Sequence, residues 1–234
     1  MDRNWIYNYW DYIHRIWCIM DVVISFGGSV FVHDEVNIEY LKKFKKWVVG
    51  LDLKVGIVVG GGSLARKYQS LVKGSIEDLD WIGIRTTWLN AELVRVFFGE
   101  FAYRKVLHNP TKRVKYGKIL FCGGWKPGWS TDYVSVVLAE TYCARKVINL
   151  SNIDYVYDKD PKVKGAKKLE NLSWDELLDI TGDEWVPGKN VPFDPIAAKL
   201  CKKNRVSVGL MNGNDLDNVT NYLNGKEFKG TRIS

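Results

Sequence analysis

LKVGIVVGGGSLARKYQSLV, residues 53–72, passes from a strand through a glycine turn into a helix. The β-branched apolar run over 55–59 predicts a buried strand, and consecutive glycines follow at 60–62. Ser63 is a candidate N-cap, because apolar residues then recur at helical spacing as far as Leu71. A strand joined to a helix by a short turn is the repeating unit of α/β folds, so this segment predicts that class.

The same order of elements recurs on both sides of this segment. DVVISFGGS (21–29) is typical of a buried strand that runs into a glycine turn. KILFCGGWKPGWSTDYVSVVLAETYC (118–143) repeats strand, glycines and helix, with Ser130 or Thr131 as the helix cap. Further along, the patterns predict a strand within 146–161, helices over 174–180, 194–203 and 215–223, strands over 205–211 and 230–233, and an irregular loop over 182–195. We therefore predict an α/β fold, a three-layer αβα sandwich with a mostly parallel central sheet.

The composition limits the classes of ligand. The chain has 234 residues and a net charge of +7, which suits a polyanion such as a nucleotide. Its lysines and arginines are spread along the chain without a nucleic-acid-binding motif, so we expect no nucleic-acid partner. No apolar run approaches the roughly 20 residues that span a bilayer, and no signal-peptide pattern is present, so we expect no membrane partner.

The cysteines favour a reducing compartment. Cys18, Cys122, Cys143 and Cys201 lie far apart, without CxxC pairs or neighbouring histidines. Neither a zinc site nor a disulfide framework is indicated by this spacing. We expect a cytoplasmic protein.

Glycines follow the predicted strands at their carboxyl ends, which is where open parallel sheets bind their ligands. Backbone amides at such turns, together with helix N-termini, favour phosphate groups. The patterns GxxxxGK[ST] and GxGxxG are absent, which argues against a P-loop enzyme and a dinucleotide-binding domain. A GxSxG elbow is also absent, and His14, His33 and His108 lie outside the glycine loops, so a hydrolase triad has little support. Phosphoryl transfer by positioning and charge neutralisation fits these patterns best.

Several motifs together carry a family resemblance. VVISFGGSV, VVGGGSLARKY, DWIGI followed by LNAELV, GGWKPGWSTD, LSNIDYVYDKDP and DPIAAK stand in this order along the chain. In order and spacing they resemble the amino acid kinase superfamily, and within it the archaeal type of uridylate (UMP) kinase, over nearly all of 20–234. The resemblance implies transfer of the γ-phosphoryl group of ATP to UMP. It also implies Mg²⁺, held mainly by the ATP phosphates and water rather than by protein ligands.

The resemblance implies a donor and an acceptor side for the site. Catalytic roles fall to Lys199, Arg66 and Gly28, with the two cations offsetting phosphate charge. The residues that match the ATP side are Ser25, Phe26, Gly27, Gly28, Ser29, Gly62, Arg66, Ser151, Asn152, Tyr157 and Asp160. Those that match the UMP side are Gly61, Asp80, Trp125, Lys126, Pro127, Gly128, Trp129, Ser130 and Thr131. We expect Asp80 to accept hydrogen bonds from ribose, and at least one of Trp125 and Trp129 to lie against the acceptor or a neighbouring subunit.

The chain departs from the family pattern at three places. Ser25 stands where related bacterial enzymes have a lysine, so one cation is missing. Trp88 replaces the arginine of a TRxNA run, and Arg85 either takes over part of its role or the contact is lost. Tyr155 replaces the glycine of DGVY. If the backbone at Tyr155 needs a positive φ, the tyrosine is strained by about 1–2 kcal/mol; otherwise the loop has changed shape.

These departures keep other functions open. One is another kinase of the superfamily that acts on a different small phosphate, although the histidine that isopentenyl phosphate kinases carry beside the second glycine turn has no counterpart here. The other is a nucleotide-binding regulatory protein with weak catalysis. The family further implies a homo-oligomer, typically a hexamer, and UTP as an inhibitor.

We expect residues 20–234 to form one domain and residues 1–19 an amphipathic helical extension. Ile6, Tyr9 and Ile13 recur at helical spacing. Such a helix would pack on the domain or on a neighbouring subunit; its polar side is not markedly basic, which disfavours a membrane-surface role. Met20 falls where the family's chains begin, so the extension is either specific to this lineage or upstream sequence included through a mistaken start codon.

Overall fold

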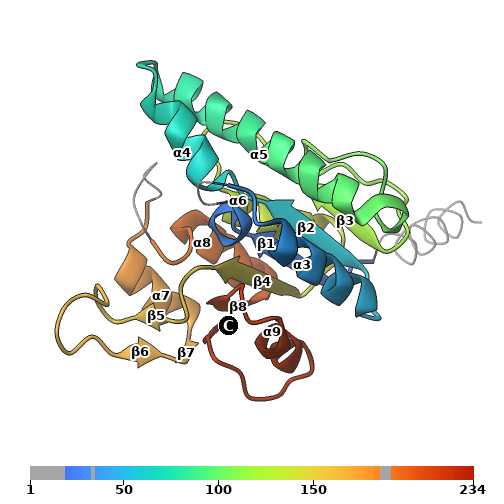
Figure 1. Ribbon diagram of the computed structural model, residues 1–234. Coiled ribbons are helices and arrows are strands. Elements are labelled where there is room, and N and C mark those ends of the chain that lie inside the picture. Colours follow the sequence, from blue (N-terminus) through green and yellow to red (C-terminus); the bar gives the residue numbers. More distant parts are fainter. Residues whose placement is uncertain (1–18, 33–34, 185–190) are drawn as a thin grey trace, which may run out of the picture.

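The computed structural model describes residues 19–32, 35–184 and 191–234 (Figure 1). The helix predicted over 1–19 lies outside the described residues, apart from Ile19. The described helices are α2 (Gly28–Phe31), α3 (Ile38–Gly50), α4 (Gly62–Ser70), α5 (Ile76–Phe98), the 3₁₀ helix η1 (Gly99–Phe101), α6 (Thr131–Thr141), α7 (Trp174–Thr181), α8 (Pro195–Asn204) and α9 (Leu216–Leu223). The described strands are β1 (Val22–Phe26), β2 (Val55–Val59), β3 (Ile119–Cys122), β4 (Lys146–Ser151), β5 (Val156–Tyr157), β6 (Lys168–Leu169), β7 (Asn171–Leu172), β8 (Ser207–Asn212) and β9 (Thr231–Ile233).

A seven-stranded sheet with the order β3-β2-β1-β4-β8-β9-β7 forms the centre of the molecule. The strands from β3 to β8 in this order run parallel, whereas β9 is antiparallel to β8 and parallel to β7. The carboxyl ends of the parallel strands therefore share one edge. The chain moves outward from β1 to β3 and then continues on the other side of β1 with β4, so β1 and β4 flank the point where ligands bind in such sheets.

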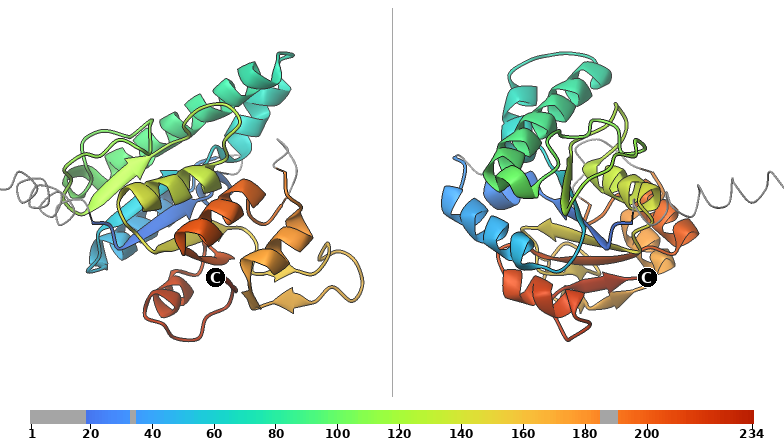
Figure 2. Two further views of the ribbon diagram at one scale, coloured as in Figure 1. Left: turned by 180° about the vertical axis from the view of Figure 1, so that it is seen from behind. Right: turned by 90° about the vertical axis from the view of Figure 1, so that its right-hand side faces the viewer.

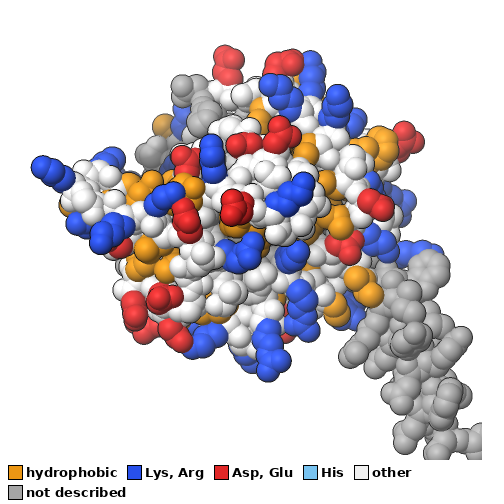
Figure 3. Space-filling model, turned by 90° about the horizontal axis from the view of Figure 1, so that it is seen from below, with side chains coloured by type: hydrophobic (Ala, Val, Ile, Leu, Met, Phe, Trp, Pro, Cys, Tyr) orange, Lys and Arg blue, Asp and Glu red, His pale blue; other side chains and the backbone are white. Residues whose placement is uncertain are grey.

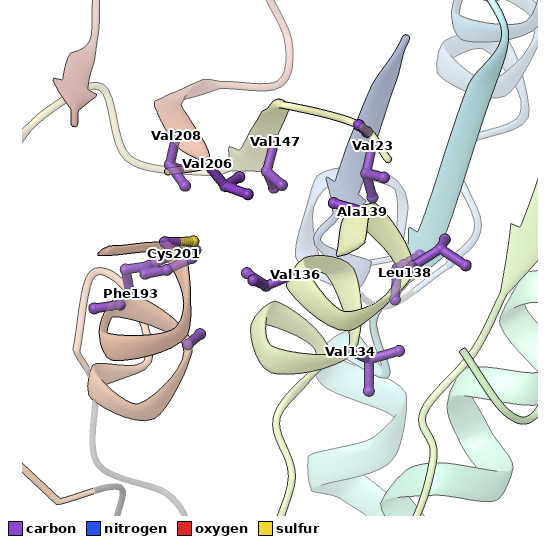
Figure 4. Close-up of a cluster of buried hydrophobic side chains, with 14 of the residues drawn as sticks. Val23, Val134, Val136, Leu138, Ala139, Val147, Phe193, Cys201, Val206 and Val208 are labelled. Carbon is purple, nitrogen blue, oxygen red and sulfur yellow. The ribbon is translucent and has the colours of Figure 1, made fainter. Parts of the chain in front are cut away.

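Helices cover both faces of the sheet, as Figures 1 and 2 show. Because successive side chains of a strand point to opposite faces, Val23 lies in the buried layer that contains α6 and α8, whereas Ile24 and Phe26 lie in the layer that contains α3, α5 and α9. In Figure 4, Val136 of α6 and Cys201 of α8 lie in the first of these layers with Val147 of β4. The predicted three-layer α/β sandwich with a mostly parallel sheet is confirmed.

Stacked aromatic rings fill the second layer. The Phe26 ring lies 4.3 Å from Phe44 and 4.8 Å from Phe31, measured between ring centroids, and each of these rings is fully buried. Such pairs add to the free energy gained from burial of their apolar area. The aromatic layer ties the end of β1 to α2 and α3, so the turn that follows Phe26 starts from a fixed position.

The glycine turn after β2 differs from the prediction in one respect. Ser63 is not the N-cap of α4; Gly61 occupies that position, and the helix begins at Gly62. The reason is that Gly62 adopts a φ of +63°, and the helix begins two residues earlier than a Ser63 N-cap would place it. The Ser63 hydroxyl donates instead to the carbonyl of Val32, at 3.0 Å. For α6, Ser130 is the N-cap and Thr131, the other predicted candidate, is the first helical residue, since the Ser130 side chain accepts from the amide of Tyr133.

Charged side chains of both signs are distributed over the surface. On the face drawn in Figure 3, lysines and arginines are interspersed with acidic and uncharged side chains. None of the helices described is both long and apolar enough to span a bilayer.

Candidate functional site

Two glycine turns meet backbone to backbone at the carboxyl ends of β1 and β2. A Cβ atom added to Gly28 would lie 2.4 Å from the nitrogen of Gly62 and 2.7 Å from the carbonyl oxygen of Gly60. The amide of Gly60 donates to the carbonyl of Phe26 at 2.9 Å, which holds the turns together. Only glycine fits this approach, because the neighbouring atoms are backbone and cannot rotate away.

Helix α5 holds the turn after β2 through hydrogen bonds from one side chain. The side-chain amide of Asn90, which is 3% exposed, donates to the carbonyls of Gly60 and Gly61 at 2.9 and 3.1 Å. These hydrogen bonds satisfy the two carbonyls. The amides at the N-terminus of α4 remain available to the site. Arg66, on the first turns of α4, has an exposed side chain. Amides at a helix start and a nearby guanidinium together suit an anion.

A polar cluster lies beside β1, on the α6 side of the sheet. The Ser25 hydroxyl donates to Asp132 Oδ1 at 3.0 Å, and Asn149 Nδ2 donates to the same oxygen at 2.8 Å. The Ser130 hydroxyl donates to Asp194, which caps α8 by accepting from the amides of Ile196 and Ala197. The cluster joins residues of β1, β4, α6 and α8 at the point where the strand order reverses.

The electrostatics of this cluster are unusual for carboxylates. Burial of the carboxyl group, reinforced by the negative charge of Asp194, raises the pKa of Asp132 to about 7. Hydrogen bonds from Ser25 and Asn149 act in the opposite direction and do not offset the burial. Burial also raises the pKa of Asp194. Asp132 therefore changes its charge near neutral pH.

The loop after β3 is held against α5. The amide of Gly128 donates to Asp80 Oδ2 at 2.8 Å, so the carboxylate expected to meet ribose is engaged by the loop itself. Trp129 stacks on Tyr133 with ring centroids 4.0 Å apart. Trp125 packs on the hydrophobic layer below α6, and the Lys126 ammonium lies 4.3 Å above its ring. Both tryptophans thus have partners within the chain, and their contact with an acceptor stays a prediction.

The remaining acceptor-side residues lie in the same region. Gly61 forms the N-cap of α4, and Thr131 is the first residue of α6. Pro127 is partly buried, between Lys126 and the Gly128 amide that binds Asp80. The predicted acceptor residues therefore belong to three segments: the start of α4, the loop after β3, and α5, which carries Asp80 and contacts the other two.

The predicted donor-side residues follow β4. Ser151 ends this strand and accepts from the amide of Ile153 at 3.3 Å, and Asn152 is exposed. Tyr157 lies in β5 and is partly buried, while the carboxylate of Asp160 accepts from the amide of Lys162 at 2.9 Å. The donor-side residues after β4 thus begin at the same edge of the sheet as the turn after β1. They then continue into the hairpin of β5 and β6.

Two residues predicted for the site have side chains directed elsewhere. The Phe26 ring lies in the aromatic layer, so any contact with a ligand falls to its backbone. The Lys199 ammonium lies 3.0 Å from both the carbonyl and the carboxylate of Asp183, next to the segment 185–190, which is outside the described residues. Lys199 would have to leave Asp183 in order to reach a phosphate.

At Trp88 and Tyr155, where the chain departs from the family pattern, the structure shows which contacts the two side chains make. Trp88 Nε1 donates to the carbonyl of Gly124 at 2.7 Å, whereas Arg85 is exposed and lies 5.9 Å from the Trp81 ring. Among the described residues other than glycine, only Cys143 and Arg205 have a positive φ, so Tyr155 carries no left-handed strain. Tyr155 instead lines a cavity of about 550 Å³ with Asp154 and Asn212.

Sequence patterns missed the polar cluster and the tryptophan contact. Asp132 stood at the end of the quoted GGWKPGWSTD motif and Asp194 at the start of DPIAAK, yet neither was assigned a role. A usable signal was present, because Ser25 and Asn149 interrupt otherwise apolar strands and buried polar residues need partners. No local pattern indicates which distant residue supplies such a partner.

Comparisons with known proteins agree with this geometry. The model of the amino acid kinase family matches residues 20–212. The uridylate kinase of Methanobrevibacter smithii is 35% identical over 224 residues, covering 92% of this chain and 99% of that protein. That of Methanoculleus marisnigri is 37% identical over 210 residues, covering 85% and 88%. The crystal structure of uridylate kinase from Archaeoglobus fulgidus superposes with a TM-score of 0.79 at 33% identity, covering 92% of this chain and all of that one. UMP kinase from Bacillus anthracis, at 20% identity, shares the fold with a TM-score of 0.73 over 92% of this chain and 96% of that one.

The glycine contact predicts a strong effect of one methyl group. Gly28→Ala places its Cβ against the backbone of Gly60 and Gly62, so we expect a loss of about 1–3 kcal/mol or more in the free energy of unfolding. Gly50→Ala is the matched control, since no atom lies within 4 Å of the added Cβ, and it should leave stability unchanged or slightly raised. Urea denaturation of both variants checks this, and equal stabilities would contradict the close approach.

The raised pKa of Asp132 predicts a pH-dependent stability. The folded protein binds a proton at Asp132 more tightly than the unfolded chain does, so the free energy of unfolding should fall as pH rises from about 4 through 7. In Asp132→Asn this component is absent, and relative to wild type the variant should gain about 2–3 kcal/mol between pH 5 and pH 8.

Chemical denaturation at both pH values measures the effect. Asp217→Asn, an exposed change on α9, serves as the control and should follow wild type. Parallel pH profiles for wild type and Asp132→Asn would show that the Asp132 carboxyl does not titrate in this range.

Proposed function

Because this chain belongs to the amino acid kinase family, we propose that it is a UMP kinase, which transfers the γ-phosphoryl group of ATP to UMP and releases UDP and ADP. The observation that carries the proposal is the likeness to archaeal uridylate kinases over nearly the whole length of both chains. An oxygen of the UMP phosphate forms the new bond to the γ-phosphorus, and the bond to the β-phosphate oxygen breaks as ADP leaves. No covalent intermediate on the protein is needed.

In this mechanism the glycine turns bind the transferring phosphates. Gly28, Ser29 and Gly62 open helices α2 and α4, and amides in the first turn of a helix have no acceptor within the helix. Their N–H groups are therefore available for phosphate oxygens on which negative charge develops. Fixed amides stabilise this charge without reorganising, because the close contact between the two glycine turns already holds them in place.

Cations complete the charge balance in the proposal. Arg66 projects from α4 beside the turn and would bind the phosphates, while Lys199 would exchange Asp183 for the leaving group. Ser25 supplies no charge, and its hydroxyl continues to donate a hydrogen bond to Asp132. A neutral, protonated Asp132 is compatible with this arrangement, since no cation stands beside it in the cluster described above.

The acceptor would bind between α5 and the loop after β3. Asp80 would exchange the Gly128 amide for ribose hydroxyls, and Ser130 and Thr131 at the start of α6 would bind the uridylate phosphate. ATP would follow the end of β4, with Ser151 and Asn152 near its phosphates and Tyr157 and Asp160 near its nucleoside.

Mg²⁺ enters the proposal as a partner of ATP. The carboxylates beside β1, Asp132 and Asp194, are engaged by hydrogen bonds from Ser25, Asn149 and Ser130. The residues present therefore fit an ion held mainly by phosphate oxygens and water, which Mg²⁺ tolerates well. When bound, it would neutralise charge on the transferring phosphates.

The proposal extends to assembly and regulation. Leu89 and Val96 lie seven residues apart on one side of α5 and are 61% and 59% exposed, an apolar strip suited to a second copy. We propose a homo-oligomer, of the hexameric type of the family, with UTP as an inhibitor and a cytoplasmic location. Residues 20–234 would act as one domain, with 1–19 as an appended helix.

The deciding experiment offers ATP and Mg²⁺ to the purified protein with UMP, CMP, dUMP or isopentenyl phosphate, and resolves the products. UDP together with an equal amount of ADP is the expected result. Turnover of isopentenyl phosphate in preference to UMP would assign the chain to another kinase of the superfamily. Tight binding of ATP or UTP without ADP formation from any acceptor would indicate a regulatory protein instead.

Arg66 provides a sharper test of the mechanism. Arg66→Ala removes a cation from the glycine turn, and kcat should fall about 10²-fold, because removal of one charge-stabilising donor has effects of this order. Lys67→Ala removes an equally exposed cation from the next position of α4 and should stay within about twofold of wild type. Initial rates with saturating ATP and UMP measure both, and equal losses would exclude a specific role for Arg66.

A further inference from the structure

The backbone of the loop after β3 is held at each end by hydrogen bonds. The Gly123 amide donates to the Leu107 carbonyl at 3.0 Å, and the Gly124 amide donates to Thr87 Oγ1 at 2.6 Å. The Gly124 carbonyl accepts from Trp88 Nε1 at 2.7 Å, and the Gly128 amide binds Asp80. Apart from the contact with Leu107, all of these partners belong to α5. The conformation of 123–128 therefore follows the position of this helix.

Neighbouring rings fix the orientation of the Trp88 indole. The His108 ring stacks on it with centroids 3.9 Å apart and an interplanar angle of 8°, and Trp81 meets it edge-on at 6.3 Å. His108 is itself placed by its neighbour Leu107, whose amide and carbonyl pair with Phe121 and Gly123. The indole is thus held between α5 and the segment that runs along the outer edge of β3.

The contact between Trp88 and the loop is too close for any residue other than glycine. A Cβ on Gly123 would lie 2.5 Å from Trp88 Cδ1, and one on Gly124 would lie 3.0 Å from Thr87 Oγ1. The loop also carries a buried carbonyl at Gly124, which would lack this donor if the indole N–H were removed. An unsatisfied buried carbonyl disfavours the conformation that contains it.

From this geometry we infer that Trp88, clamped by His108, is a positioning residue that holds the loop 123–131 in the conformation that accepts the UMP phosphate. The inference rests on the proposed function, since that function assigns the loop to the acceptor. Trp88 does not touch the reacting atoms. It acts by raising the fraction of molecules whose loop is ready to bind, and the apparent affinity for the acceptor scales with that fraction.

The simplest alternative is that Trp88 only packs. In that case its loss would lower the stability of the whole protein and affect both substrates alike. A positioning role differs, because the effect should be confined to the acceptor and to the amides of the loop. The two can be separated by a variant that keeps an aromatic ring at position 88 but loses the N–H group, compared with a control variant that loses the same part of an indole elsewhere.

Trp88→Phe is this variant, and Trp47→Phe is its matched control. Trp47 Nε1 donates to Thr220 Oγ1 at 2.8 Å, a comparable indole hydrogen bond between α3 and α9. For Trp88→Phe we expect the KM for UMP to rise about 3–10-fold, the range associated with one hydrogen bond, with the KM for ATP within about twofold of wild type. For Trp47→Phe neither KM should change.

Hydrogen–deuterium exchange provides a readout that needs no activity. In the ligand-free protein, amides of 123–130 should exchange about 3–10-fold faster in Trp88→Phe than in wild type, and at the wild-type rate in Trp47→Phe. His108→Ala should accelerate the same amides, while His108→Phe, which keeps a flat ring on the indole, should restore slow exchange.

The outcomes separate the two hypotheses. Unchanged exchange in Trp88→Phe, or equal effects of Trp88→Phe and Trp47→Phe on the KM for UMP, would overturn the positioning role. If wild-type protein forms no UDP, the proposed function fails, and the exchange rates of the loop still decide whether Trp88 positions it.

Discussion

The contact of Gly28 with Gly60 and Gly62 is the constraint on which the rest of the site depends. Two chain turns can share this space only because neither carries a side chain. Their contact sets the distance between the start of α2 and the start of α4, and therefore the spacing of the amides that are proposed to bind phosphate. Asn90 then fixes α5 relative to the same turn. One backbone contact thus helps to position both the proposed phosphate site and the longest described helix.

The sequence carried enough information to predict this part of the molecule. Runs of β-branched residues that end in glycines specify parallel strands and their turns, since both signals are local. The sequence pattern places the N-cap of α4 at Ser63, two residues after the observed N-cap Gly61, because the positive φ of Gly62 depends on the contact with Gly28, which lies in another turn. The helices α3 and α5 were not predicted as units, although motifs within α5 were recognised.

The polar cluster shows why the site was only partly predictable. Ser25 and Asp132 are 107 positions apart, and their hydrogen bond exists only because α6 packs beside β1. A lost lysine was visible in the sequence, but the partner that Ser25 finds instead was not. The same holds for Trp88, whose Nε1 meets a carbonyl 36 positions away. Residue types are local information, whereas the satisfaction of buried polar groups is a property of the assembled fold.

Helix α5 has a consequence for the way the two halves of the site communicate. Asn90 of this helix reaches Gly60 and Gly61, while Thr87 and Trp88, in the same turn, and Asp80, nearer its start, reach the loop after β3. A single helix of 23 residues therefore contacts both segments that are proposed to bind phosphate. Any ligand that shifts this helix at one segment shifts it at the other, and thermodynamic linkage makes the resulting free energy equal in both directions. Donor and acceptor would then influence each other's affinity through the protein, in addition to their direct contact during phosphoryl transfer.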